Sequence, residues 1–419
     1  MFRTGIHFGD RLAERGSQFA DFRRISGGCR FCYCRISERQ KEVKKLLLIL
    51  LFCRISMLGG ITPEQLNKVL GVPLIGNNAK EWTLPALQQR AKIRFSGNAG
   101  RFSAKIRSRI AGAMPVEMIV YTTGKNQQIK RISVIYANKG DTGKRYSSRI
   151  KEDKRNIDST LSKVLGQSRR NSFQSGNLRV KADMWHSNCA DIFLEVNKND
   201  FTMLHLIPPG SGKKASGSGE KDYSGHVKRN KFGDVFIPDV PMVDQGPKGY
   251  CVPATVERVF LYYGIAIDMH HLADIGNSSS EDGTDTGQML KDITQIRRRA
   301  GLKMEQNKSL STKTVARYID KGYPLFWIMY STSGLDKVYN FSRKNRSQAK
   351  TPDEWKRMLK KISIPADNEG PHMCLIIGYN RETNEIAVSN SWGDAHIAPL
   401  WIPMKAASKV SREILVFIP

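Results

Sequence analysis

One cysteine stands where a turn-rich segment gives way to an apolar one, in the stretch DQGPKGYCVPATVERVFLYYG at residues 244–264. We expect a helix to begin at about Val252, because Pro253 is tolerated in a first helical turn. The Cys251 thiol would then face unpaired backbone N–H groups, which favour the thiolate, the nucleophilic form. Since isolated cysteines usually pack as small apolar side chains, the other polar residues nearby decide between packing and reactivity.

Three further residues have the chemistry that a thiol nucleophile needs. Gln245 precedes Cys251 by six residues on a glycine-rich approach, so its amide can fold back and donate to an oxyanion beside the Cys251 N–H. His372 opens the apolar segment HMCLIIGYN, and Asn390 lies near the end of the following segment EIAVSNSW. If these segments form a hairpin, the Asn390 carbonyl can accept from one imidazole nitrogen and leave the other for the thiol. Trp392 would shield that hydrogen bond from water.

The order Gln, Cys, His, Asn, the six-residue step to the cysteine and the NSWG stretch at 390–393 resemble papain-like cysteine peptidases. The form DQGPKGYCVPAT is similar to the bacteriocin-processing, double-glycine peptidase-like branch. The resemblance covers about residues 236–419 and implies a papain-type fold, in which the cysteine helix packs on the histidine-bearing sheet. Carried over by position, it implies Cys251 as nucleophile, His372 as general base and acid, Asn390 as orienting residue and Gln245 as oxyanion donor.

The expected activity is hydrolysis of peptide bonds in a peptide or protein substrate through a thiol acyl-enzyme, with no cofactor or metal. QGPKGYC departs from papain-like enzymes proper, since it lacks their second cysteine and the tryptophan after the nucleophile. Two alternatives stay open. A thiol acyltransferase of the transglutaminase-like kind would use the same site with an amine as acceptor, although such enzymes usually have Asp where this chain has Asn390. A non-catalytic papain-fold module would leave binding to the basic front of the chain.

Other histidines and cysteines compete with these assignments. None of the histidines is followed by an Asn-Ser-Trp segment of the kind that follows His372, so we interpret them as structural or solvent-exposed. The remaining cysteines of the last two domains are interpreted as packing residues or as incidental. These competing residues are His186, Cys189, His270, His271, Cys374 and His396.

The charge of the chain is concentrated in its front part. Of 419 residues, 67 are Lys or Arg and 39 are Asp or Glu, a net charge of +28. Residues 1–240 hold 43 basic and 20 acidic residues, whereas residues 241–419 hold 24 and 19. This bias favours contact with an anionic envelope polymer or a membrane surface through the N-terminal half. No zinc-finger, RNA-binding or helix-turn-helix signature is present, which argues against specific nucleic-acid binding.

The texture of the sequence predicts an α+β fold with two domains. Residues 61–207 contain short helical signals followed by segments of period two, typical of a small basic α+β domain of unknown role. Residues 208–234 are rich in Gly, Ser and Lys and predict a flexible linker. Residues 235–419 begin with helices and continue with a mostly antiparallel set of strands, the papain-like domain. Within it, the loops at 277–286 and 331–350 are expected to line the substrate pocket.

The beginning of the chain predicts export. Residues 43–60, VKKLLLILLFCRISMLGG, have two lysines before the apolar run Leu46–Cys53, the pattern of a secretory signal peptide. A signal normally stands at the start of a chain. If Val43 is the true initiator, residues 1–42 are not part of the native protein. Otherwise we expect these residues to be disordered. CRFCYC at 29–34 has no second pair at zinc-finger spacing, which argues against a zinc site.

We therefore predict that the mature protein in its source cells lacks residues 1–42 and begins at about residue 60. Mass spectrometry of the native N-terminus checks this prediction. A native peptide containing GIHFGD contradicts the start at Val43, and an unprocessed chain in the cytosolic fraction contradicts export.

Overall fold

The computed structural model describes residues 60–419 except 176, 198–199, 211–221, 280–282 and 363–369. Apart from Gly60, these residues belong to one compact unit, Ile61–Pro419. The predicted signal segment and the cysteines at 29–34 lie outside the described residues. Within the described part of the chain, no helix has the length and apolar composition that crossing a membrane requires.

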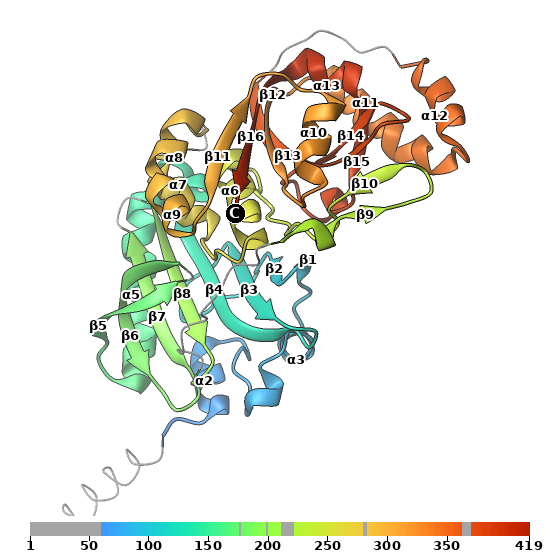
Figure 1. Ribbon diagram of the computed structural model, residues 1–419. Coiled ribbons are helices and arrows are strands. Elements are labelled where there is room, and N and C mark those ends of the chain that lie inside the picture. The colour runs from blue at the N-terminus through green and yellow to red at the C-terminus, as the bar shows by residue number, and fades with distance from the viewer. Residues whose placement is uncertain (1–59, 176, 198–199, 211–221, 280–282, 363–369) are drawn as a thin grey trace, which may run out of the picture. The chain divides into compact units, whose positions relative to one another are not determined.

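Residues 61–207 form an antiparallel sheet with helices, the sheet domain (Figure 1). Its strand order is β1-β2-β3-β4-β8-β7-β6-β5. The long helix α5 buries Ile150, Ile157 and Leu161 against this sheet. The strands are β1 Ser96–Asn98, β2 Arg101–Ala104, β3 Glu117–Thr123, β4 Gln128–Asn138, β5 Arg169–Ser175, β6 Leu178–His186, β7 Asp191–Asn197 and β8 Phe201–Ile207. The α-helices are α2 Pro63–Leu70, α3 Leu84–Ala91, α4 Lys139–Thr142 and α5 Tyr146–Leu165.

Residues 223–419 form a second antiparallel sheet, the central sheet, with helices around it. Its strand order is β11-β16-β12-β13-β10-β9, and β14 branches from β13 and pairs with β15. The strands are β9 Lys228–Arg229, β10 Asp234–Phe236, β11 Lys303–Asn307, β12 Leu325–Tyr330, β13 Pro371–Asn380, β14 Glu385–Ser389, β15 Leu400–Pro403 and β16 Ser411–Ile418. The α-helices are α6 Cys251–Tyr262, α7 Met269–Ile275, α8 Thr286–Asp292, α9 Thr294–Arg299, α10 Thr312–Ile319, α11 Ser333–Asn345, α12 Pro352–Leu359 and α13 Met404–Val410.

The predicted α+β organisation is confirmed, as are several local signals. Thr62 caps α2 through a capping box with Pro63 at the first helical position, so the backbone donors of the first turn are satisfied. Asp268, Ser311 and Thr351 cap their helices through side-chain oxygens. The hairpin predicted from the segments that contain His372 and Asn390 is present as the β13–β14 pair.

Two expectations are wrong in detail. Residues 331–350 are mostly helix α11 rather than a pocket loop, because Thr332 caps the helix and Leu335, Val338 and Tyr339 pack in the core. Residues 222–234 of the expected linker are structured: Tyr223 is buried, and β9 and β10 join the central sheet.

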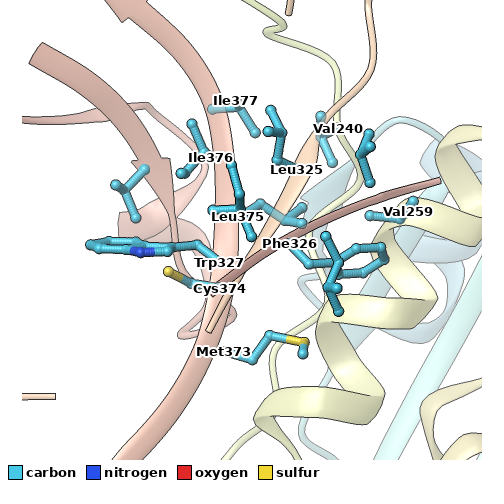
Figure 2. Packing of buried hydrophobic residues seen from close by; sticks show 14 of the residues in the cluster. Val240, Val259, Leu325, Phe326, Trp327, Met373, Cys374, Leu375, Ile376 and Ile377 are labelled. Atoms are coloured by element: carbon cyan, nitrogen blue, oxygen red, sulfur yellow. The ribbon is translucent and has the colours of Figure 1, made fainter. Parts of the chain in front are cut away.

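The core of the central sheet fills both of its faces (Figure 2). Neighbouring residues of a strand point to opposite faces, so Phe326 lies on the side of Val259 from α6, whereas Trp327 lies on the other side. Cys374 is paired with Trp327 in the β12–β13 register and is fully buried. Burial raises the pKa of its thiol, which fits the predicted packing role.

Buried polar contacts join the sheet domain to α6 and α7. Arg101 Nε of β2 lies 2.8 Å from Glu257 Oε1 of α6, with side chains only 2% and 0% exposed. Burial alone would lower the pKa of Arg101, but the carboxylate of Glu257 raises it well above its usual range. Tyr121 of β3 donates to Asp268 Oδ2 at 2.8 Å.

Two histidines that the sequence left as structural or exposed are buried beside this interface. His271 Nε2 lies 2.9 Å from Glu195 Oε1 of β7, and His270 Nδ1 lies 2.7 Å from Asp268 Oδ1. Burial would raise the pKa of Glu195, yet hydrogen bonds from His205 and His271 lower it to about 2. His271 therefore joins α7 to the sheet domain, whereas His270 binds the residue that caps its own helix.

Replacing Arg101 should destabilise the protein strongly, because it leaves the Glu257 carboxylate buried without its charge partner. We expect Arg101→Ala to lower the free energy of unfolding by about 3–5 kcal/mol in urea titrations. Arg101→Met combined with Glu257→Gln should recover part of this loss, since the introduced amide oxygen would still accept from the Met269 N–H. The matched control is Arg229→Ala, which removes an exposed pair with Asp320 and should change stability by about 0–1 kcal/mol. Equal effects of the two alanine variants contradict the prediction.

Candidate active site

Helix α6 begins at Cys251, one residue before the expected start, with Pro253 in its first turn. Its first turns dock on β13 next to His372: Thr255 Oγ1 donates to the Met373 carbonyl at 3.2 Å, and the Met373 N–H faces the Cys251 sulfur. Ten of the twelve α6 residues are buried, so this helix lies inside the protein and fixes the position of its first residue.

The predicted pairing of His372 with Asn390 is present. His372 lies near the start of β13, Asn390 follows the end of β14, and their side chains meet at 3.0 Å through His372 Nε2 and Asn390 Oδ1. Because an amide oxygen accepts, Nε2 carries the proton and Nδ1 is left as the acceptor of the neutral ring. Asn390 is fully buried and His372 is nearly so.

Trp392 covers the imidazole as expected. Its ring stacks on His372 with a centroid distance of 5.0 Å and an interplanar angle of 27°. The same ring also contacts His396 edge to face, with a centroid distance of 5.3 Å. His396 therefore supports the tryptophan, and no other histidine is hydrogen-bonded to Asn390 in the described part of the chain.

Gln245 is held by both ends of its amide. Ser391 Oγ donates to Gln245 Oε1 at 2.7 Å, and Gln245 Nε2 donates to the Lys248 carbonyl at 3.3 Å. The backbone N–H of Gln245 also donates to the Ser391 carbonyl at 2.9 Å. The amide thus has a fixed orientation with its NH₂ group on the side of the cysteine turn. The sequence did not predict a role for Ser391, although this residue lies in the NSWG stretch that also contains Asn390.

Arg258 is a second residue that the sequence did not reveal. It is fully buried in α6, and its guanidinium donates to Ser389 Oγ at 2.6 Å and to the Ser389 carbonyl at 3.0 Å. It also donates to the Pro241 carbonyl at 2.8 Å. Burial lowers the pKa of Arg258 to about 10, so the group remains charged at neutral pH. Arg258 therefore ties the cysteine helix to the strand end that precedes Asn390.

A cavity of about 1030 Å³ opens at this site and is lined by Cys251, Gln245 and His372. Residues 283–286 contribute one wall, as expected of the loop at 277–286, and β11 and β16 contribute another. None of the described residues of 331–350 lines the cavity, because α11 packs against β15 instead. The remaining wall comes from α8 and from Ile328 of β12.

Burial shifts both members of the thiol–imidazole pair toward their neutral forms. It raises the pKa of Cys251, against the opposing effect of the backbone N–H groups of Met373, Val252 and Cys251 itself. It lowers the pKa of His372, against the opposing hydrogen bond to Asn390. The thiolate expected from the helix N-terminus is therefore disfavoured by desolvation. In the described part of the chain, no cluster of three or more His, Cys, Asp or Glu is arranged to hold a metal ion.

Comparison with known proteins finds similarity over part of the chain, including a family match at residues 237–409. A comparison with curated proteins gives no significant match. Xylellain, a cysteine protease from Xylella fastidiosa, is 15% identical over 48% of this chain and 90% of its own, with a TM-score of 0.31. The peptidase domain of Streptococcus ComA, a bi-functional ABC transporter involved in a quorum sensing pathway, is 13% identical over 42% of this chain and 97% of its own, with a TM-score of 0.27.

Both identities and both TM-scores are low. Residues 237–409 match the Peptidase_C39 like family, and this segment contains all four predicted site residues. The resemblance to papain-like cysteine peptidases of the C39-like branch, predicted from Gln245, Cys251, His372 and Asn390, is thereby confirmed for this part of the chain.

Proposed function

We propose that the protein hydrolyses peptide bonds with Cys251 as nucleophile, His372 as general base and acid, Asn390 as orienting residue and Gln245 as oxyanion donor. The observation that carries the proposal is the hydrogen bond from His372 Nε2 to Asn390 Oδ1, on an imidazole that shares one cavity with Cys251. This bond fixes the tautomer that leaves Nδ1 free to take a proton. The C39-like family match supports the same reaction class.

The reaction starts from the neutral pair that burial favours. His372 Nδ1 takes the proton of the Cys251 thiol as sulfur attacks the substrate carbonyl carbon, and a tetrahedral oxyanion forms. The Gln245 Nε2–H and the Cys251 backbone N–H donate to that oxygen. The imidazolium gives its proton to the leaving amine, so the C–N bond breaks and a thioester remains. Water, deprotonated by His372, then attacks the thioester and releases the acid and the thiol.

Two alternative functions differ in how they use this site. The first uses the same residues for acyl transfer, and the second uses none of their chemistry. A thiol acyltransferase would form the same thioester and pass the acyl group to an amine, so added amine would appear in the product. A non-catalytic module would bind peptide without turnover. The intact set of four residues and the hydrogen-bonded tautomer of His372 favour catalysis over binding alone, and Asn390 in place of Asp favours the hydrolase over the acyltransferase. Mass spectrometry of products from a diverse peptide library, with and without added amine, separates these functions.

Replacing the nucleophile should abolish turnover and leave the fold intact, because Cys251→Ala removes only one sulfur atom. His372→Ala should remove activity as well. The measurements are the rate of peptide cleavage and the extent of labelling by a thiol-directed epoxide, the latter determined by intact-mass analysis. The matched control is Cys189→Ala in the sheet domain, a buried cysteine whose S–H faces the Ile61 carbonyl at 3.0 Å, and it should cleave and label like the parent. Wild-type cleavage by Cys251→Ala contradicts the assignment.

Removing the proposed oxyanion donor should slow the chemical step and spare substrate binding. We expect Gln245→Ala to lower kcat by roughly 10²-fold or more with little change in KM, the pattern of a lost transition-state interaction. The matched control is Gln288→Ala in α8, where the side chain pairs with Asp292 on the exposed surface at 2.9 Å. An unchanged kcat in Gln245→Ala removes this residue from the oxyanion role.

A further inference from the structure

The approach to the nucleophile, residues 245–250 (the oxyanion loop), contains a lysine that is turned inward. Lys248 stands between Gln245 and Cys251, and its side chain is only 5% exposed. A lysine is almost never fully buried unless it is paired, because an unpaired ammonium group is strongly disfavoured away from water. The location of its partners therefore shows what holds the loop.

Both charge partners of Lys248 come from the sheet domain. Its Nζ lies 3.1 Å from Asp141 Oδ2 and 3.7 Å from Glu117 Oε2. Burial alone would lower the pKa of Lys248, but Glu117 and Asp141 raise it, so the ammonium stays charged. Asp141 is itself fixed, because Asn138 Nδ2 donates to its Oδ2 at 2.9 Å and Asp141 N donates back to Asn138 Oδ1 at 2.9 Å.

A second contact fixes the end of the loop next to the nucleophile. Tyr250 is 1% exposed and packs directly on Gly140, the neighbour of Asp141. A side-chain carbon at Gly140 would lie only 2.7 Å from Tyr250 Cζ, so the turn at 138–142 approaches as closely as glycine allows. The short helix α4, which contains Gly140 and Asp141, thus contacts both Lys248 and Tyr250, on either side of Gly249.

The backbone of Lys248 connects these contacts to the proposed chemistry. Its carbonyl accepts the hydrogen bond from Gln245 Nε2 at 3.3 Å, the amide that we assign to the oxyanion. Gly246 has a φ of +62°, which lets the chain turn sharply enough for this short return. If Lys248 moved, the Gln245 amide would lose the acceptor that sets its orientation and keep only its contact with Ser391.

We propose that the sheet domain positions the oxyanion donor: Glu117 and Asp141 hold the Lys248 side chain, and the Lys248 carbonyl aims the Gln245 amide. Lys248 is thus a positioning residue that acts through Gln245, and Glu117 and Asp141 are the residues of the sheet domain that support it. This inference rests on the proposed peptidase function. It assigns a role to the domain for which the sequence predicted none.

Lys248→Met tests the proposal, because it keeps the length of the side chain and removes its charge. We expect kcat to fall by about tenfold or more, up to the loss caused by Gln245→Ala, with KM little changed. The double variant Gln245→Ala/Lys248→Met should be no slower than Gln245→Ala alone, since a residue that acts through Gln245 has nothing left to position. Lys248→Arg, which can keep the ion pair, should recover part of the rate.

The matched control is Lys139→Met. This lysine lies in the same turn of the sheet domain, but its Nζ contacts Asn277 at an exposed position, 3.1 Å away. We expect parental kinetics. Alkylation of Cys251 by iodoacetamide separates positioning from misfolding, because this displacement at a saturated carbon forms no oxyanion. Lys248→Met should alkylate at the parental rate while kcat falls.

Three results overturn the proposal: an unchanged kcat in Lys248→Met, multiplicative losses in the double variant, or an equal loss in Lys139→Met. If Lys248→Met fails to fold, Asp141→Asn provides the same kinetic test with one charge partner neutralised. Hydrogen exchange of the amides in residues 246–250 should be faster in Lys248→Met than in Lys139→Met. This measurement needs no turnover, so it tests the positioning even if the parent cleaves no peptide.

Discussion

Helix α6 has no side that faces water, and the remainder of the site depends on this constraint. The helix carries two adjacent buried charges of opposite sign, Glu257 and Arg258, which point to different neighbours. Glu257 pairs with Arg101 of the sheet domain, whereas Arg258 binds the Ser389 end of β14. Because a helix is rigid, these two contacts fix the position of Cys251, the first residue of the helix, in relation to both neighbours.

The same contacts explain why the imidazole pair is so well enclosed. Thr255 holds β13 directly beside His372, and Arg258 holds β14 directly before Asn390. The β13–β14 hairpin then brings the two side chains together, and Trp392 covers them. Helix α6 and the β13–β14 hairpin together thus enclose the thiol and the imidazole, which line one cavity. The electrostatic consequence of this enclosure is that desolvation favours the neutral pair over the ion pair.

The sequence was informative where chemistry and local pattern coincide. Gln245, Cys251, His372 and Asn390 were predicted as a set from residue type, order and spacing, and the β13–β14 hairpin from the apolar segments that contain His372 and Asn390. Glu257 and Arg258 could not be identified, because charged residues in a helix ordinarily face water and only the tertiary structure shows their partners. The sequence predicted a loop in place of helix α11, because the packed positions of this helix are separated by polar residues. The composition of residues 223–234 predicted a linker, although β10 pairs with β13.

The charge of the sheet domain is also distributed in a way that composition conceals. Glu117, Glu195 and Asp200 are nearly buried. Glu117 pairs with Lys248, and Glu195 pairs with His271 of α7. Arg101 of the same domain is buried against Glu257 of α6, so the domain contributes charges of both signs to these internal contacts. These internal pairs join the sheet domain to the C39-like part of the chain, and a residue count alone does not reveal which charged residues form them.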